Sequence, residues 1–268
     1  MRIEGNVFVV TGGGNGIGRE VVLALLARGA RVAAVDLRAD SLAEISAVAG
    51  AGDRLSTHAL DLTDRAAVAA LPDAVLTAHG QVDGLLNVAG VIQQFVPFAD
   101  LTYEQMEQVL AVNLWGVLHT TKELLPHLLG RPAACVVNVS SMGGLAPVPG
   151  QTVYGASKAA VKLFTEGLYA ELLGTRVAVT AVYPGGVRTG IAENSGATLA
   201  GSGSGSESDL AADLTSAEAA ARQILVGVEK GSYRVVIGRD ARAIDLLSRL
   251  APRRATELVA KKMASLIG

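Results

Sequence analysis

A tyrosine and a lysine stand four residues apart in the segment Tyr154-Gly155-Ala156-Ser157-Lys158. In a helix, side chains at this spacing lie on the same face, so the lysine ammonium and the tyrosine phenol would be neighbours. A nearby positive charge favours the phenolate and lowers the phenol pKa from about 10 toward neutral pH. The pair therefore predicts that Tyr154 can act as a general acid and base.

A run of polar residues precedes that pair and adds a hydroxyl to the predicted site. Asn138-Val139-Ser140-Ser141 lies at the carboxyl end of an apolar stretch that has the composition of a buried strand. Open α/β sheets bind their ligands at this end of their strands. A serine hydroxyl placed there can hold a substrate oxygen while the charge on that oxygen changes.

A glycine-rich segment, Thr11-Gly12-Gly13-Gly14-Asn15-Gly16-Ile17-Gly18, connects the first strand-like run to a helix-like run. Glycines let backbone N–H groups approach a pyrophosphate at a helix N-terminus. Asp36 follows about 20 residues later, where a carboxylate binds ribose hydroxyls and repels a 2′-phosphate. The Lys-Ser/Thr ending of a nucleotide-binding P-loop is missing, because Arg19 and Glu20 come next. The pattern indicates a dinucleotide site.

These residues need a sheet and helices to position them, and the sequence alternates between the two kinds of element. This alternation is typical of βαβ units and a parallel sheet, and the right-handed crossover rule makes the sheet doubly wound. We expect strands at Asn6–Val10, Arg31–Asp36, Leu55–Leu60, Asp83–Val88, Cys135–Val139 and Val177–Val182. We expect helices at Gly16–Arg28, Ser41–Val48, Arg65–His79, Tyr103–Val112, Leu114–Leu129 and Val153–Leu173.

The predicted fold class is α/β: one Rossmann-type, doubly wound parallel sheet of about seven strands with helices on both faces. The chain has 268 residues, half of them hydrophobic and 18% charged, which suits a single dinucleotide-binding and catalytic domain over residues 1–268. The formal charge of −2 gives no electrostatic reason to expect nucleic acid as a partner. The single cysteine, Cys135, excludes an internal disulfide and lies in an apolar run that predicts a buried side chain.

Targeting and metal signals are weak in this sequence. The first residues lack the basic and apolar regions of a signal peptide, and no apolar run reaches the length of a membrane span. We therefore expect a cytoplasmic protein. The four histidines show no metal-ligand spacing, so no metal site is expected.

Two segments depart from the alternating pattern. The first is rich in Gly and Ser from Ala192 to Asp213, which predicts a mobile substrate loop over about residues 190–215. The second, residues 239–268, mixes apolar and basic residues, which is typical of a helical extension. Packing on a subunit or over the pocket mouth is the favoured interpretation, and weak peripheral contact with a membrane is the alternative.

Taken together, these motifs resemble the short-chain dehydrogenase/reductase family, and the resemblance covers Asn6 to Thr189. The family's Thr-Gly-x-x-x-Gly-x-Gly turn corresponds to the glycine-rich segment described above. Its catalytic serine, thirteen residues before the tyrosine, corresponds to Ser141. The resemblance implies that the catalytic residues are Asn113, Ser141, Tyr154 and Lys158.

The same resemblance implies a set of cofactor contacts. The family's Asn-Asn-Ala-Gly strand end is similar to Asn87-Val88-Ala89-Gly90, where Val88 replaces the second Asn. Its Pro-Gly-x-Val-x-Thr turn, which holds the nicotinamide carboxamide, begins here at Pro184. The cofactor-binding residues expected on this basis are Gly12, Asn15, Gly16, Ile17, Gly18, Asp36, Leu37, Asp61, Leu62, Asn87, Ala89, Gly90, Tyr154, Lys158, Pro184, Gly185, Val187 and Thr189.

The family mechanism implies hydride transfer between the carbinol carbon of a secondary alcohol and a nicotinamide. Tyr154 would take the hydroxyl proton while Ser141 orients the oxygen. Lys158 would bind the nicotinamide ribose and lower the pKa of Tyr154. Asn113 would help to hold the lysine through a water-linked proton path.

Asp36 favours NAD over NADP as the cofactor. NADP-using relatives place Arg or Lys beside the glycine turn or just after the second strand, where this chain has Asn15 and Leu37. The nearby Arg38 keeps an NADPH-dependent carbonyl reductase as an alternative. A catalytically silent NAD-binding sensor is a third interpretation, although such a protein typically loses the Tyr or the Lys. A serine hydrolase is set aside, because Ser140 and Ser141 lack the Gly-x-Ser-x-Gly elbow.

The expected substrate pocket has a mostly apolar lining. It draws on Val91–Phe98, Met142–Pro149, Gln151 and the stretch after Thr189, and it predicts a lipophilic secondary alcohol or ketone. Substrate contacts are expected from Ser141, Gln151 and Tyr154. The family resemblance implies a homodimer or homotetramer that packs through Leu114–Leu129 and Val153–Leu173.

Overall fold

The chain forms a seven-stranded parallel sheet in a computed structural model that describes residues 1–197 and 214–263. The strand order is β3-β2-β1-β4-β5-β6-β9, so the chain reverses direction across the sheet between β1 and β4. This order confirms the predicted doubly wound sheet. The strands are β1 (Val7–Thr11), β2 (Arg31–Asp36), β3 (Leu55–Ala59), β4 (Gly84–Asn87), β5 (Ala134–Val139), β6 (Val177–Pro184) and β9 (Arg234–Ile237); β7 (Val187–Arg188) pairs separately with β8 (Thr215–Ser216).

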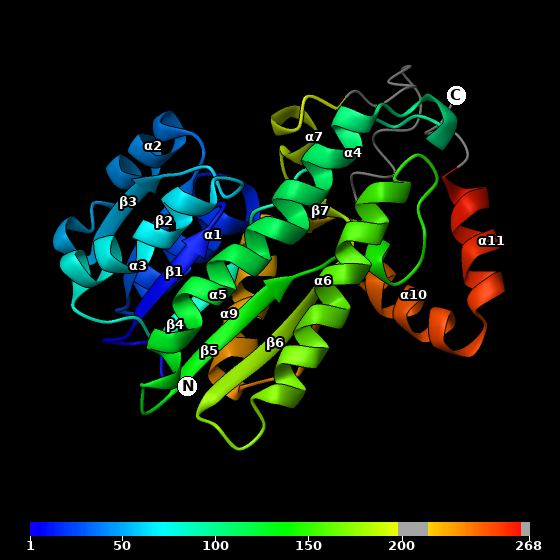
Figure 1. Cartoon of the computed structure of the whole chain (residues 1–268). Helices are drawn as coiled ribbons and strands as arrows, with labels where there is room; N and C mark the ends of the chain where they lie inside the picture. The colour runs from blue at the N-terminus through cyan, green and yellow to red at the C-terminus, as the bar shows by residue number, and fades with distance from the viewer. Residues whose placement is uncertain (198–213, 264–268) are drawn as a thin grey trace.

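Helices cover both faces of this sheet (Figure 1). One face packs on α1, α2 and α9, and the other packs on α3, α5 and α6. Helices α10 and α11 form a pair at the edge of the molecule beyond α6. The helices are α1 (Gly16–Ala27), α2 (Ala39–Ala49), α3 (Arg65–His79), α4 (Tyr103–Leu110), α5 (Gly116–Leu129), α6 (Thr152–Glu171), α7 (Ile191–Asn194), α9 (Ala217–Lys230), α10 (Arg239–Leu250) and α11 (Pro252–Lys262).

The central strands are apolar throughout because both of their faces are buried. In β1, Phe8 and Val10 belong to the core on one side of the sheet, while Val7 and Val9 belong to the core on the other side. This division follows from the two-residue repeat of a strand. Cys135 of β5 is buried in the first core, as the sequence predicts.

The ends of several helices are fixed by capping groups. Asp64 accepts hydrogen bonds from the backbone N–H groups of Ala66 and Ala67 at the start of α3. Gly80 then ends this helix in the left-handed conformation, with φ +79°. Such local signals explain why the predicted bounds of α3 agree with the structure.

The predicted helices Tyr103–Val112 and Leu114–Leu129 are continuous in the structure. A π-helical turn, Ala111–Trp115, joins α4 to α5 and contains Asn113. One extra residue per turn changes the direction of the side chains relative to an α-helix. Asn113 consequently points into the interior, where it is fully buried.

The last strand and the helix before it, β9 and α9, lie in a segment to which the sequence pattern assigns no element. β9 has four residues, occupies one edge of the sheet and is only partly buried except at Ile237. It therefore lacks the continuous apolar run that marks the central strands. Helix α9 packs closely against α1 and helps to cover one face of the sheet.

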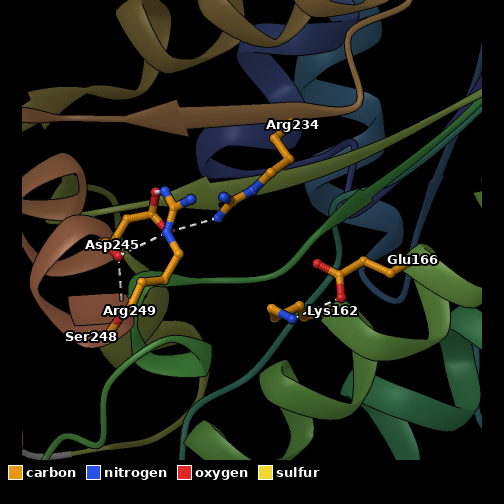
Figure 2. Close-up of polar contacts among 6 residues, drawn as sticks. All are labelled: Lys162, Glu166, Arg234, Asp245, Ser248 and Arg249. Carbon is orange, nitrogen blue, oxygen red and sulfur yellow. Dashed lines mark hydrogen bonds and ion pairs between the residues drawn. The ribbon is translucent and has the colours of Figure 1, made fainter. Parts of the chain in front are cut away.

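The C-terminal helices are tied to the edge of the sheet by one carboxylate. Asp245 of α10 forms ion pairs with Arg249 of the same helix and with Arg234 of β9, the latter at 2.7 Å (Figure 2). The guanidinium of Arg234 also lies 4.8 Å from the ring centroid of Tyr183 in β6. These contacts anchor α10, and Pro252 begins α11 after a break at Ala251.

The extension predicted for residues 239–268 is thus helical through residue 262, and residues 264–268 lie outside the described part of the chain. Most of the substrate loop predicted for residues 190–215 also lies outside it, because residues 198–213 are not described. Among the described residues, no helix has the length and apolar character that a membrane crossing requires.

Candidate functional site

Most of the predicted site residues meet in a cavity of about 510 Å³ at the carboxyl edge of the sheet. The segments that follow β1, β4, β5 and β6 form most of its wall. Parallel strands bring these four chain segments together although they are far apart in sequence. The cavity lining includes Ser141, Tyr154 and Lys158 together with the glycine turn.

The glycine turn places the N-terminus of α1 at this cavity. Gly12 has a φ of +68°, and a Cβ atom at this position would lie 2.8 Å from the Cα of Ala89. Asn15, at the N-cap position, makes no capping bond and donates instead to the hydroxyl of Ser41 at 2.9 Å. The first N–H groups of α1 therefore have no side-chain cap, which is the arrangement that anion-binding helix ends use.

Asp36 lies at the end of β2 and lines the same cavity. Its Oδ2 accepts a hydrogen bond from the backbone N–H of Gly14 at 2.9 Å. Arg38 faces a second carboxylate, because its Nε and one terminal nitrogen donate to the two oxygens of Asp40 at 3.1 and 2.7 Å. The one cation near Asp36 that we expected to favour a 2′-phosphate is thus already paired with a carboxylate.

Tyr154 lies in the first turn of α6 and is half-buried beside Ser141. A hydrogen bond from Ser141 lowers the pKa of the Tyr154 phenol, but burial raises it by more. The Ser141 hydroxyl oxygen also accepts from the backbone N–H of Gly143 at 3.0 Å. The serine and tyrosine hydroxyls are therefore neighbours on the wall of one cavity.

Lys158 is almost fully buried, with 3% of its surface exposed. Its ammonium donates to the backbone carbonyl of Val139 at 3.1 Å, and burial lowers its pKa to about 8. We expected this lysine to lower the pKa of Tyr154. That expectation is wrong for the structure, because removal of the phenol from water dominates and Lys158 lies 5.9 Å from the ring centroid.

Asn113 lies behind the cavity wall rather than in it. Its side chain exchanges two hydrogen bonds with the backbone of Val91, at 2.8 and 2.9 Å, and donates to the hydroxyl of Ser157 at 3.0 Å. Gly90 lies between Asn113 and Lys158: a Cβ there would lie 3.2 Å from Asn113 Oδ1 and 3.0 Å from Lys158 Nζ. The asparagine and the lysine therefore approach each other across a residue that must be small.

Asn87 also lies away from the cavity. Its amide donates to Asn138 at 2.8 Å and to Thr121 at 3.2 Å, and its oxygen accepts from Thr120 at 2.7 Å. This buried polar ladder joins β4 to β5 and α5. The side chain of Asn87 therefore supports the strand ends, whereas Ala89 and Gly90 line the cavity.

The turn after β6 completes the wall of the cavity. Its residues from Pro184 to Val187, with Thr189, line the cavity, and so do Leu37, Asp61 and Leu62 on the other side. Asp240, at the start of α10, holds the turn by accepting from the Gly186 N–H at 2.7 Å. Asp240 could not be identified from the sequence, because it lies more than 50 residues from the turn and belongs to no motif.

The other half of the cavity has the apolar lining that we expected. Ile92, Phe95, Met142 and Val148 lie in it together with the polar Gln151. Leu145, which we placed in the same pocket, instead lines a smaller adjoining hollow. Met263, just after α11, also reaches the cavity wall, so the C-terminal extension contributes to the lining.

Comparison with known proteins agrees with this arrangement. The family model for short chain dehydrogenases matches residues 6–200. A putative oxidoreductase, SadH, from Mycobacterium tuberculosis is 40% identical over 272 residues, which cover 97% of this chain and 96% of the relative.

Two solved structures share the whole architecture. A short-chain dehydrogenase/reductase from Burkholderia phymatum, in complex with NAD, superposes with a TM-score of 0.84 at 28% identity, over 96% of this chain and 97% of the other. A short chain dehydrogenase from Burkholderia cenocepacia, in complex with NADP, gives a TM-score of 0.79 at 26% identity over 98% and 99%. The chain therefore belongs to the short-chain dehydrogenase/reductase family of oxidoreductases.

Proposed function

We propose that this protein interconverts a secondary alcohol and its ketone, with NAD as its hydride acceptor or donor. The observation that carries the proposal is the meeting of the Tyr154 phenol, the Ser141 hydroxyl and the Lys158 ammonium on one cavity wall. Tyr154 and Ser141 can hold one substrate oxygen and move its proton, while the neighbouring Lys158 would bind the cofactor. A serine hydrolase of the Ser–His type would need a histidine beside the serine, and among the described residues no histidine lines this cavity.

In the direction of oxidation, the hydroxyl of the alcohol donates its proton to the phenolate oxygen of Tyr154. The C–H bond of the carbinol carbon breaks and its electron pair leaves with the hydrogen as a hydride, for which bound NAD would be the acceptor. The electron pair of the broken O–H bond forms the second bond of the carbonyl. Ser141 holds the oxygen while this happens. In the direction of reduction, the Tyr154 phenol returns the proton to the carbonyl oxygen.

The glycine turn has the features of a dinucleotide-binding site. The uncapped N-terminus of α1 would hold the pyrophosphate, Asp36 the adenosine ribose, and the turn from Pro184 to Thr189 the nicotinamide. Lys158 would hold the second ribose. Bound NAD supplies the hydride acceptor and a positive charge, which would oppose the effect of burial on the pKa of Tyr154.

The choice of NAD over NADP rests on charge. Asp36 places a carboxylate where a 2′-phosphate would lie, and Leu37, which is 68% exposed, adds no cation. Arg38 donates to Asp40, so this guanidinium already has a carboxylate of the chain itself as its partner. These contacts support NAD even though relatives of this chain bind either cofactor.

The apolar half of the cavity supports a lipophilic substrate. Ile92, Phe95, Val148 and Met263 offer an apolar surface, and the binding of an apolar group to this surface is favourable because it removes that group from water.

We also propose that the protein is a homodimer or homotetramer. Exposed apolar side chains on or beside α5 and α6, the helices expected to pack between subunits, support it: they include Trp115, Leu129, Leu163, Tyr169 and Leu173.

The first prediction concerns Tyr154. A panel of aliphatic, aromatic and steroidal secondary alcohols is incubated with NAD and with NADP, and formation of the reduced cofactor is followed by absorbance. Tyr154→Phe should lower turnover by at least about 100-fold, because the general base is lost. NADH affinity, measured by fluorescence titration, should change little.

Tyr103→Phe is the matched control, because Tyr103 is 78% exposed on α4 and should keep wild-type turnover. Undiminished turnover in Tyr154→Phe would contradict the assigned proton transfer. Wild-type protein that binds NADH but turns over neither alcohols nor the corresponding ketones would favour a sensor.

The second prediction concerns cofactor choice. Asp36→Ala should lower kcat/KM for NAD, because the carboxylate that binds the ribose hydroxyls is lost. Asp40→Ala should leave NAD use nearly unchanged and raise kcat/KM for NADP, because it releases Arg38. The ratio of NADP to NAD use should rise by about tenfold in Asp36→Ala, the scale of one charged contact. It should rise by less in Asp40→Ala, by up to about fivefold, because the Arg38–Asp40 ion pair is exposed. A ratio that stays constant in both variants would refute the charge argument.

The third prediction follows from the burial of Lys158. Burial lowers its pKa from 10.5 to about 8, so between these values the unfolded chain binds more protons and wild-type stability rises with pH. Below about pH 8 Lys158 is protonated in the folded state, so folding bears the whole free energy of removing its ammonium from water. Lys158→Met removes that cost and should raise the free energy of unfolding at pH 7 by about 1–3 kcal/mol.

The comparison is made by urea unfolding across the pH range. The advantage of Lys158→Met should shrink as the pH rises toward the unfolded value, whereas the exposed control Lys122→Met should show no such trend. The variant should also lose turnover. A Lys158→Met variant that is less stable than the wild type at pH 7 would contradict the proposed cost of the buried ammonium. A difference in the free energy of unfolding that does not change with pH would contradict it too.

A further inference from the structure

The catalytic helix begins without a cap of its own. α6 starts at Thr152, and Gln151 at the N-cap position makes no side-chain bond to the first turn. The first N–H groups of a helix have no partner within the helix, and a local side chain normally supplies an oxygen to the second or third of them. In α6 these two N–H groups belong to Val153 and to Tyr154 itself.

A glutamine far away in sequence supplies the missing oxygen. Gln93 lies in the loop after β4, and its Oε1 accepts from the Val153 N–H at 2.9 Å and from the Tyr154 N–H at 3.0 Å. Its side chain is only 2% exposed. The contact is therefore a buried N-cap that is provided by another loop.

The remaining groups of Gln93 fix the residues just before the helix. Its Nε2 donates to the carbonyl of Gly150 at 3.0 Å, and its backbone carbonyl accepts from the Gln151 amide at 2.8 Å. Both ends of the Gln93 side chain amide are thus bonded to the start of α6. A buried amide with all of these bonds is costly to move, since each lost bond leaves a polar group without a partner.

The same loop is connected to Tyr154 by a second route. Asn113 binds the backbone of Val91 on one side and the hydroxyl of Ser157 on the other. The Ser157 hydroxyl in turn donates to the carbonyl of Tyr154 at 2.7 Å. The backbone N–H and C=O of Tyr154 are therefore both held by side chains, one through Gln93 and one through Ser157.

We propose that Gln93 is a positioning residue, which holds the backbone of Tyr154 and so aims its phenol at the substrate oxygen beside Ser141. This inference rests on the proposed alcohol–ketone function. Gln93 does not line the cavity, so it acts only through the helix start. A shift of the reacting group by about 1 Å is enough to cost about 100-fold in rate.

Gln93→Met tests the proposal, because it keeps the length of the side chain and removes both the acceptor and the donor. We expect kcat to fall by about ten- to a hundredfold, with little change in NADH affinity. The primary isotope effect with an alcohol deuterated on its carbinol carbon should increase, because hydride transfer becomes slower. Gln93→Glu keeps an acceptor oxygen and should recover most of kcat.

Hydrogen exchange measured in the absence of substrate reports on the contact itself. Backbone amides of Val153 and Tyr154 should exchange faster in Gln93→Met, with exchange elsewhere in α6 nearly unchanged. Gln223→Met is the matched control, because among the described residues Gln223 on α9 donates to Ala219 of its own helix and makes no contact with α6. It should alter neither turnover nor exchange at the start of α6.

Three outcomes would overturn the proposal. The first is an unchanged kcat in Gln93→Met, and the second is a fall in kcat that an equal loss of NADH binding or of folded protein explains. The third is a kcat that stays low in Gln93→Glu although the Tyr154 amide exchanges at the wild-type rate. Failure of the proposed function gives a different result. In that case wild-type protein itself turns over no alcohol or ketone, while the exchange measurement still reports on the contact between Gln93 and α6.

Discussion

Lys158 carries an ammonium group where water hardly reaches, and the surrounding structure is arranged to hold it. The carbonyl of Val139, at the end of β5, accepts its hydrogen bond. Gly90 leaves room for it next to Asn113, and α6 brings Tyr154 one turn away. A buried cation costs free energy, so the fold retains it at the expense of stability. The free energy that its burial costs is compensated by the apolar cores on the two faces of the sheet.

The polar groups of the site are held by a network rather than by single contacts. Asn113 links the loop after β4 to Ser157, and Gln93 links the same loop to the first turn of α6. Asp240 has a comparable role elsewhere in the cavity wall, because it accepts a hydrogen bond from the turn after β6. The parallel sheet makes this possible, because it delivers four loops to one edge. Each loop is then fixed by a side chain from another element.

The sequence predicts those parts of the structure that depend on local patterns. The glycine turn, the spacing of Tyr154 and Lys158, and the apolar central strands were all recognisable, and they identify the family and its fold. The sequence does not reveal the roles of Gln93 and Asp240 or the presence of the edge strand β9, because these depend on partners that are distant in sequence. The expected effect of Lys158 on the pKa of Tyr154 was wrong for a related reason. Spacing along a helix reports a neighbouring charge but gives no measure of burial.

The central claim is that a hydride leaves the carbinol carbon of a secondary alcohol and reaches the nicotinamide. It is tested most directly with an alcohol deuterated at that carbon, incubated with the protein and NAD, followed by mass spectrometry of the cofactor. The account predicts NADH that carries the deuterium and a ketone that carries none at the carbonyl carbon. Ketone formation with unlabelled NADH, or with the label released to water, would contradict it.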